Sequence, residues 1–124
     1  MLLVSAKVGV SKIHGFGLIA EEFIPKGTCI WRFQPGFDLM IGEAEFAALS
    51  ATTQTQVRHY AFYDPARQAF VLSGDDDRFT NHSDDPNTAE EGGYDSYAKR
   101  DIQAGEEITW NYFGWGNPEF LKNR

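Results

Sequence analysis

The stretch Arg78-Phe79-Thr80-Asn81-His82-Ser83-Asp84-Asp85-Pro86-Asn87 is the most distinctive in this chain of 124 residues. Amide, imidazole and hydroxyl groups stand together at its centre, and a Pro-Asn pair closes it. Asn81 offers both hydrogen-bond donors and an acceptor, and Arg78 offers a planar fork of donors. The run therefore indicates a binding loop, although a structural loop satisfied by its own side chains would have a similar composition.

Two other kinds of site fit this stretch less well. A nucleophilic Ser83 activated by His82 would need an elbow motif around the serine, which the sequence does not contain, and adjacent residues rarely face one another in a triad. A metal site using His82 with Asp84 or Asp85 would need further ligands, but the three histidines of the chain have no ligand spacing. We therefore expect no metal.

The second informative stretch is Gly105-Glu106-Glu107-Ile108-Thr109-Trp110-Asn111-Tyr112. As a strand it places Ile108, Trp110 and Tyr112 on one face, because side chains alternate with period two. Three bulky groups on one face are typical of a core. A tyrosine at the end of the strand is also suited to present its hydroxyl to a site, so the local pattern leaves both roles open.

A glycine pair lies near the start of the chain, in Gly15-Phe16-Gly17-Leu18-Ile19-Ala20. It matches the dinucleotide-binding fingerprint, which requires a helix directly after the glycines. Pro25-Lys26-Gly27 breaks the chain within two turns, so we exclude that interpretation. Either a plain tight turn or a glycine loop that lets backbone approach a ligand remains.

The chain also contains a weak internal repeat, with Ala, three residues, Ile, two residues, Gly, two residues and Ile. It occurs at residues 20–30 and again at residues 98–108. Each copy predicts a strand, a glycine turn and a returning strand, with Gly27 and Gly105 at positive φ. One repetition is too few for a solenoid.

The remaining pattern predicts many short strands and one helical insert. Helix formers occupy residues 43–49 and 53–60, and Ser50-Ala51-Thr52 interrupts them. Strands are expected at residues 69–72, 94–102 and 106–112, whereas residues 81–91 read as irregular. Strands and helices do not alternate, so a doubly wound sheet is excluded.

Composition excludes several classes of protein. The single cysteine, Cys29, rules out an internal disulfide or a cysteine-based zinc site. The net charge of −7 disfavours nonspecific binding to nucleic acid or anionic membranes and suits a basic partner, although solubility alone would explain it. No apolar run is long enough to span a membrane, and the start of the chain lacks a secretory leader. We expect an intracellular, cytoplasmic protein.

Together, the glycine pair, the Arg-Phe-x-Asn-His-Ser…Pro-Asn stretch and the Gly-Glu-Glu-Ile-Thr-x-Asn-Tyr stretch resemble the SET domain of protein lysine methyltransferases. The resemblance extends over nearly the whole chain and is closest to compact bacterial or viral members without zinc-binding flanks. It implies a single SET domain over residues 1–124 with a mostly β, β-clip fold. It also implies a helical insert at about residues 42–60 and a knot-like crossing before a closing segment at about residues 113–124.

The resemblance further implies the roles of individual residues. Tyr112 matches the catalytic tyrosine of the family, and S-adenosylmethionine would be the methyl donor, with no metal. The residues implied to bind this donor are Gly15, Phe16, Gly17, Arg78, Asn81, His82 and Trp115. The residues implied to form the lysine channel are Phe33, Tyr63, Phe79 and Trp110.

Some positions depart from the family pattern. Asp84 stands where a cysteine is usual, Asn111 replaces an aspartate, and Trp110 replaces the Phe or Tyr that sets how many methyl groups fit. Phe33 stands where many members carry a channel tyrosine. The resemblance implies methyl transfer to a lysine of a protein or peptide, for which a histone tail is one option, and a homodimer is another expectation. The alternative is a catalytically inactive SET-like module that binds a basic peptide or mediates assembly.

Overall fold

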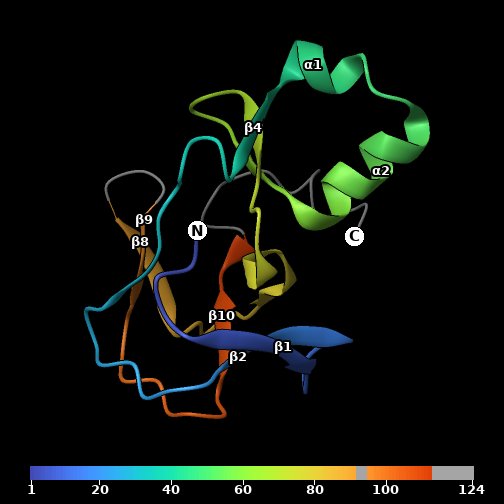
Figure 1. Cartoon of the computed structure of the whole chain (residues 1–124). Helices are drawn as coiled ribbons and strands as arrows, with labels where there is room; N and C mark the ends of the chain where they lie inside the picture. Colours follow the sequence, from blue (N-terminus) through green and yellow to red (C-terminus); the bar gives the residue numbers. More distant parts are fainter. Residues whose placement is uncertain (92–94, 113–124) are drawn as a thin grey trace.

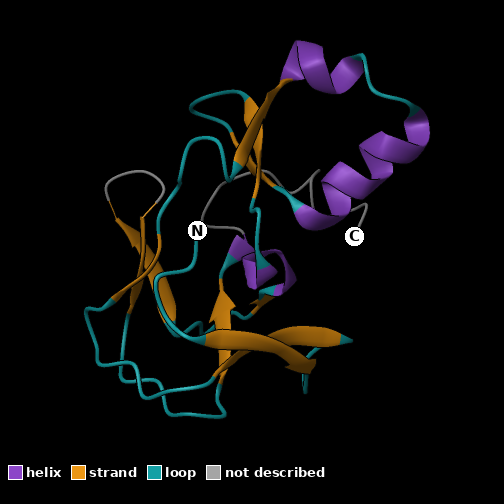
Figure 2. Ribbon diagram, in the orientation of Figure 1, coloured by secondary structure: helices purple, strands orange, loops and turns teal. Residues whose placement is uncertain are grey.

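The computed structural model describes residues 1–91 and 95–112, and the fold there is mostly β. Short strands form three small sheets, with two helices at one end of the molecule and the β1–β2 pair at the other (Figures 1 and 2). The first sheet contains, in spatial order, β1 (Ala6–Val10), β2 (Phe16–Ala20), β10 (Glu107–Trp110) and β7 (Asn81–His82). The second contains β3 (Cys29–Trp31), β9 (Asp95–Ala98) and β8 (Thr88–Glu91), and the third β4 (Leu39–Gly42), β6 (Ala69–Leu72) and β5 (Phe62–Asp64).

The two copies of the internal repeat pair with each other. The N–H of Ile24 donates to the carbonyl of Ile102 at 2.8 Å, and the N–H of Ile102 donates back at 2.9 Å. On either side, the N–H of Gly27 donates to the carbonyl of Ala98, and the N–H of Gly105 donates to the carbonyl of Ala20. The same contact therefore occurs twice, once in each direction.

This pairing corrects the expected hairpins. Gly27 and Gly105 both have φ of +88°, so the predicted glycine turns are confirmed. The arms of each turn, however, do not pair with one another. Strand β2 pairs antiparallel with β10, and β3 pairs with β9, so the last arm of each copy pairs with the strand that leads into the other copy. Sequence pattern alone favours the local partner, because closing a short loop costs less entropy.

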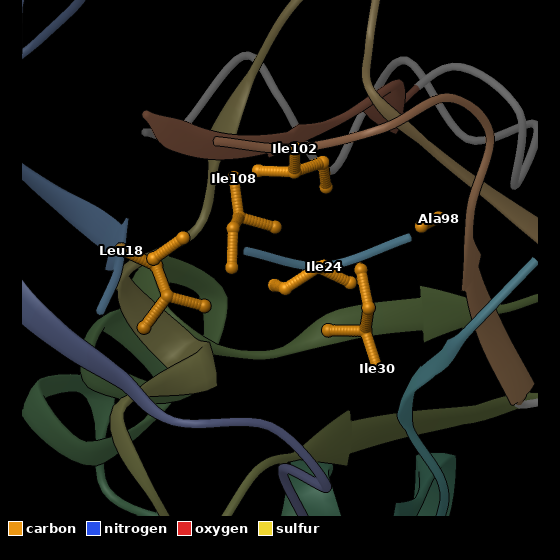
Figure 3. Close-up of a cluster of buried hydrophobic side chains, with 7 residues drawn as sticks. Leu18, Ile24, Ile30, Ala98, Ile102 and Ile108 are labelled. Carbon is orange, nitrogen blue, oxygen red and sulfur yellow. The ribbon is translucent and has the colours of Figure 1, made fainter. Parts of the chain in front are cut away.

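The core is built from the same two segments. Three pairs of equivalent positions are almost fully buried, together with Leu18, and six of the seven residues are labelled in Figure 3. These pairs are Ala20 with Ala98, Ile24 with Ile102, and Ile30 with Ile108. The repeat thus supplies both the backbone pairing and the apolar side chains at the centre of the domain.

The helical insert is present as α1 (Glu43–Ala47) and α2 (Ala51–Tyr60). Helix α2 begins two residues earlier than expected, because Ser50 caps it by accepting a hydrogen bond from the N–H of Thr53. No helix in the described part of the chain is long and apolar enough to span a membrane.

Residues 81–91, expected to be irregular, were interpreted wrongly. Within this stretch, residues 81–82 form β7 and residues 88–91 form β8, and the 3₁₀ turn η1 (Asp76–Phe79) precedes it. Strand β7 runs parallel to β10, which brings the C-terminal strand beside the Asn-His pair. The closing segment at residues 113–124 lies outside the described residues.

The paired repeat makes a prediction about stability. Replacing Ile102 by Ala should lower the free energy of unfolding by about 3 kcal/mol, because a fully buried side chain would leave a cavity. Ile13→Ala is the control, since Ile13 is half exposed and should cost less than about 0.5 kcal/mol. Urea unfolding of both variants measures the difference, and equal losses would contradict this view of the core.

Candidate functional site

The side chain of Asn81 links the glycine loop to β10 through hydrogen bonds. Its side-chain amide donates to the carbonyl oxygens of His14 at 3.1 Å and Phe16 at 2.9 Å. The same amide lies 3.1 Å from the hydroxyl of Ser11 and 3.1 Å from the carboxylate of Glu107. The carboxylate of Glu107 also accepts from the Ser11 hydroxyl, at 2.8 Å and 2.9 Å. One amide and one carboxylate therefore hold the loop against β7 and β10.

The structure explains the glycines at positions 15 and 17 of this loop in different ways. At Gly17, a Cβ would lie only 2.5 Å from an oxygen of Glu107 and 3.1 Å from the amide nitrogen of Asn81. At Gly15, φ is +52° and a Cβ would meet no atom within 4 Å. Glycine at position 17 thus allows the side chains of Asn81 and Glu107 to pack closely against the loop, whereas the backbone at Gly15 borders open space. Phe16 between them is largely exposed.

The Asn-His strand meets the end of β10 through His82 and Tyr112. The backbone N–H of Tyr112 donates to Nδ1 of His82 at 3.0 Å, so the proton of a neutral imidazole resides on Nε2. Nε2 in turn contacts the carboxylate of Asp84 at 2.8 Å. The N–H of Ser83 points to the carbonyl of Trp110. Peptide groups alternate along a strand, so the main chain of His82 faces away from β10.

Tyr112 is half-buried and its hydroxyl has a definite position. The hydroxyl donates to the carbonyl of Thr80 at 2.7 Å, and the ring lies 5.2 Å from that of His82 and 4.8 Å from that of Trp110. Of the two roles that the sequence pattern left open for Tyr112, the structure therefore favours a position beside the Asn-His strand over one in the apolar core.

A cavity of about 50 Å³ lies next to these groups, where parts of all three sheets come together. Four aromatic residues, two acidic residues and one arginine are among the residues that line it. The lining includes Trp31, Tyr60, Phe62, Asp77, Thr80 and Trp110. Trp110 packs edge-on against Phe62 at 5.5 Å, and Thr80 carries the carbonyl that accepts from Tyr112.

The other expected site residues fall into two groups. Arg78 lines the cavity, donates to the carbonyl of Ser73 at 3.1 Å and stacks on Tyr60, whose ring also packs against Phe79. Phe33 and Tyr63 are not among the cavity-lining residues.

These two aromatic residues have partners elsewhere. Phe33 packs on Trp31, and the Tyr63 hydroxyl donates to Glu43 in the helical insert. That hydrogen bond is the main cause of a raised pKa of the Tyr63 phenol. Trp115 lies outside the described residues.

Asp77 and Trp31 are two residues of the cavity that the sequence does not single out. Asp77 belongs to a run of three acids, a composition that is typical of a turn solvated by water. Burial, opposed by a hydrogen bond from the Ser73 hydroxyl, raises the pKa of Asp77 to about 6, and repulsion from Asp75 adds to the effect. Trp31 is 3% exposed, and its indole N–H has no acceptor within the described residues. No local pattern signals either property, since both depend on which segments meet.

Among residues 1–91 and 95–112, no three His, Cys, Asp or Glu side chains are grouped closely enough to hold a metal ion. The polar groups that could receive a small molecule are the open backbone of the glycine loop and the main chain of β7.

Comparison with known proteins identifies the chain's relatives. The SET domain family matches residues 15–113. The "Histone-lysine N-methyltransferase, H3 lysine-36 specific" of Aspergillus oryzae is 32% identical over 120 residues, a match covering 86% of this chain and 12% of that protein. The protein of the same description from Mycosarcoma maydis is 33% identical over 117 residues, covering 79% of this chain and 11% of that protein.

A solved structure of the Chaetomium thermophilum Polycomb Repressive Complex 2 bound to GSK126 has the same fold. The TM-score is 0.70 at 22% identity, and the match covers 96% of this chain and 17% of that chain. This chain therefore spans only a small part of the length of the relatives that it matches.

The hydrogen bonds of Asn81 predict how a negative charge at this position changes the free energy of unfolding. Asn81→Asp keeps the side-chain shape but turns two donors into an acceptor that faces Glu107 and two carbonyl oxygens. We expect a loss of about 2 kcal/mol or more in the free energy of unfolding. Asn81→Ala, which removes the donors without adding charge, should lose less. Urea unfolding at pH 7 ranks the two variants, and the reverse order would contradict the assigned hydrogen bonds.

The raised pKa of Asp77 predicts how stability changes with pH. Between the ordinary aspartate value of 3.8 and about 6, the folded protein binds more protons at this carboxyl than the unfolded chain does. Its stabilising contribution is thus complete below the ordinary value and is lost as pH rises through about 6.

Asp77→Asn removes this dependence. We expect its stability relative to wild type to rise by about 2 kcal/mol between pH 4 and pH 7. Asp76→Asn, at an exposed neighbour, is the control and should show little change. Urea unfolding at several pH values measures both, and a constant difference for Asp77→Asn would show that its carboxyl is not perturbed.

Proposed function

Because this chain belongs to the SET domain family, we propose that it is a protein-lysine methyltransferase that uses S-adenosylmethionine as its methyl donor. The matched relatives described as histone-lysine methyltransferases support the reaction class, although the chain covers only a small part of each. The single observation that carries the proposal is the position of Tyr112. Its hydroxyl and its backbone N–H both contact the Asn-His segment, through Thr80 and His82.

The glycine loop and β7 are suited to hold the donor. Open space at Gly15, where a Cβ would meet nothing, gives a bound molecule access to backbone atoms. Asn81 fixes the loop. The main chain of His82 faces away from β10, where its N–H and carbonyl would form hydrogen bonds with the adenine. Trp115 would stack on the same ring. When bound, the donor supplies an electrophilic methyl group on a sulfonium, and the lysine nitrogen displaces the thioether as the new N–C bond forms.

The role of the protein is to orient the amine and to remove competing water. A lysine ammonium has no lone pair, so it must lose a proton before it reacts. The like charge of the bound sulfonium would lower the pKa of a lysine placed beside Trp110, Phe62 and Phe79. The Tyr112 hydroxyl, held at the Thr80 carbonyl, would orient the amine, and positioning of this kind supplies most of the acceleration.

The substrate is proposed to be a lysine in a basic protein or peptide. The net charge of −7 favours association with a basic partner. The curated relatives suggest histone H3 as the first candidate, so a histone panel should be compared with extracts of other proteins. Cytoplasmic location and homodimer formation stay predictions.

Tyr112→Phe tests the proposal. It removes only the hydroxyl, so we expect the rate of methyl transfer to fall about a hundredfold or more while the Kd for S-adenosylmethionine changes little. Release of S-adenosylhomocysteine with a lysine-rich protein panel measures the rate, and calorimetric titration measures the Kd.

Tyr97→Phe is the matched control, because the Tyr97 hydroxyl contacts Asp95 in the second sheet. It should retain wild-type activity. A Tyr112→Phe rate within threefold of wild type would reject the assigned role. Wild-type protein that binds S-adenosylmethionine and basic peptides without forming product would favour the inactive binding module instead.

A further inference from the structure

The cavity beside Tyr112 has the chemistry of a site for an alkylammonium group. The faces and edges of Trp31, Tyr60, Phe62 and Trp110 line it, and aromatic rings attract cations. Asp77 lines the same space. A lysine side chain has both the apolar stem and the charged end that such walls accommodate.

The guanidinium of Arg78 does not cancel this preference. Its Nη2 donates to the carbonyl of Ser73, and its Cζ lies 5.6 Å from the centre of the Tyr60 ring. Its charge is thus placed against a carbonyl and a ring face. Two carboxylates, Asp77 and Glu90, line the cavity together with this one guanidinium.

We propose that Asp77, which lines the cavity, accepts the proton that the target lysine must lose. This role rests on the proposed methyltransferase function and adds an acceptor to it. The Tyr112 hydroxyl orients the amine and Asp77 receives the proton, and Thr80 contacts both of these residues.

The transfer balances without any further reactant. An N–H bond of the ammonium breaks, and its electron pair stays on nitrogen as the lone pair. A carboxylate oxygen of Asp77 takes this proton as a new O–H bond forms. The products are a neutral amine and a carboxylic acid, which returns its proton to solvent after each turnover.

The surroundings of Asp77 are suited to this cycle. The hydroxyls of Ser73 and Thr80 donate to its two oxygens at 2.9 Å and 3.3 Å. The charge of Asp75 raises its pKa and the Met1 ammonium lowers it, while Arg78, Glu90 and Tyr60 are the other ionisable groups around the cavity. With a pKa of about 6, the group is ionised at pH 7 yet is a better proton acceptor than an ordinary aspartate.

The first test is a binding measurement on the wild-type protein and does not require turnover. The Asp77 carboxyl carbon is titrated by NMR with n-butylammonium, a mimic of the lysine side chain, and with neutral n-butanol. A cation in the cavity should lower the pKa of Asp77 by about one unit, and butanol should not. Equal titration curves with the two probes would overturn the proposal.

The second test compares Asp77→Asn with the control Asp76→Asn, whose side chain is exposed. We expect Asp77→Asn to lose at least about tenfold in kcat at pH 7 and to lose the acidic limb near pH 6, with the Kd for S-adenosylmethionine unchanged. Asp76→Asn should match wild type. An Asp77→Asn variant with wild-type kcat and pH profile would overturn this proposal alone.

Loss of the methyltransferase activity and loss of the role of Asp77 give different results. If the wild-type protein methylates no lysine, both the proposed function and the role of Asp77 are lost. If it does so, and the NMR titration shows no response to butylammonium, only Asp77 is removed from the reaction. Should Asp77→Asn fold poorly, the wild-type titration still decides the question.

Discussion

The reciprocal backbone pairing of the two repeat segments is the constraint on which the rest of this structure depends. Ile24 and Ile102 exchange two hydrogen bonds, and the glycine turn of each segment donates to the other. The side chains of the same residues fill the core. Without the other segment, each turn would expose unpaired peptide groups and an apolar face to water. Each segment is therefore stabilised by its contacts with the other segment.

This pairing determines where β10 lies, and β10 in turn assembles the site. One edge of β10 pairs with β2, which leads from the glycine loop, and the other pairs with β7, which carries Asn81 and His82. The buried amide of Asn87 adds a further clamp, since it donates to the carbonyl of Glu107 and accepts from the N–H of Thr109. These contacts fix the position of β10 and therefore the position of Tyr112, which follows this strand.

Sequence predicted the local features of this arrangement and missed those that depend on distant segments. The turns at Gly27 and Gly105 and the helical insert follow from residue type and short spacing. The partner of each repeat arm does not follow from these local features, because the two copies offer identical backbone donors and acceptors. Resemblance to a family supplied the site residues, and the structure brings Asn81, His82 and Tyr112 together while Tyr63 turns toward Glu43.

The cavity illustrates why the missed residues matter for chemistry. Asp77 occurs in a run of three acids, a composition that usually indicates a solvated turn, yet the 3₁₀ turn η1 directs it toward aromatic rings. A carboxyl group with a raised pKa reduces stability at neutral pH, as does the buried indole N–H of Trp31, which has no acceptor in the part of the chain that the structure describes. Two destabilising groups in one small space next to Tyr112 are hard to explain by packing, because apolar side chains would fill it better. Groups perturbed in this way concentrate where a protein moves protons or binds charge, and the cavity lies where the proposed reaction requires both.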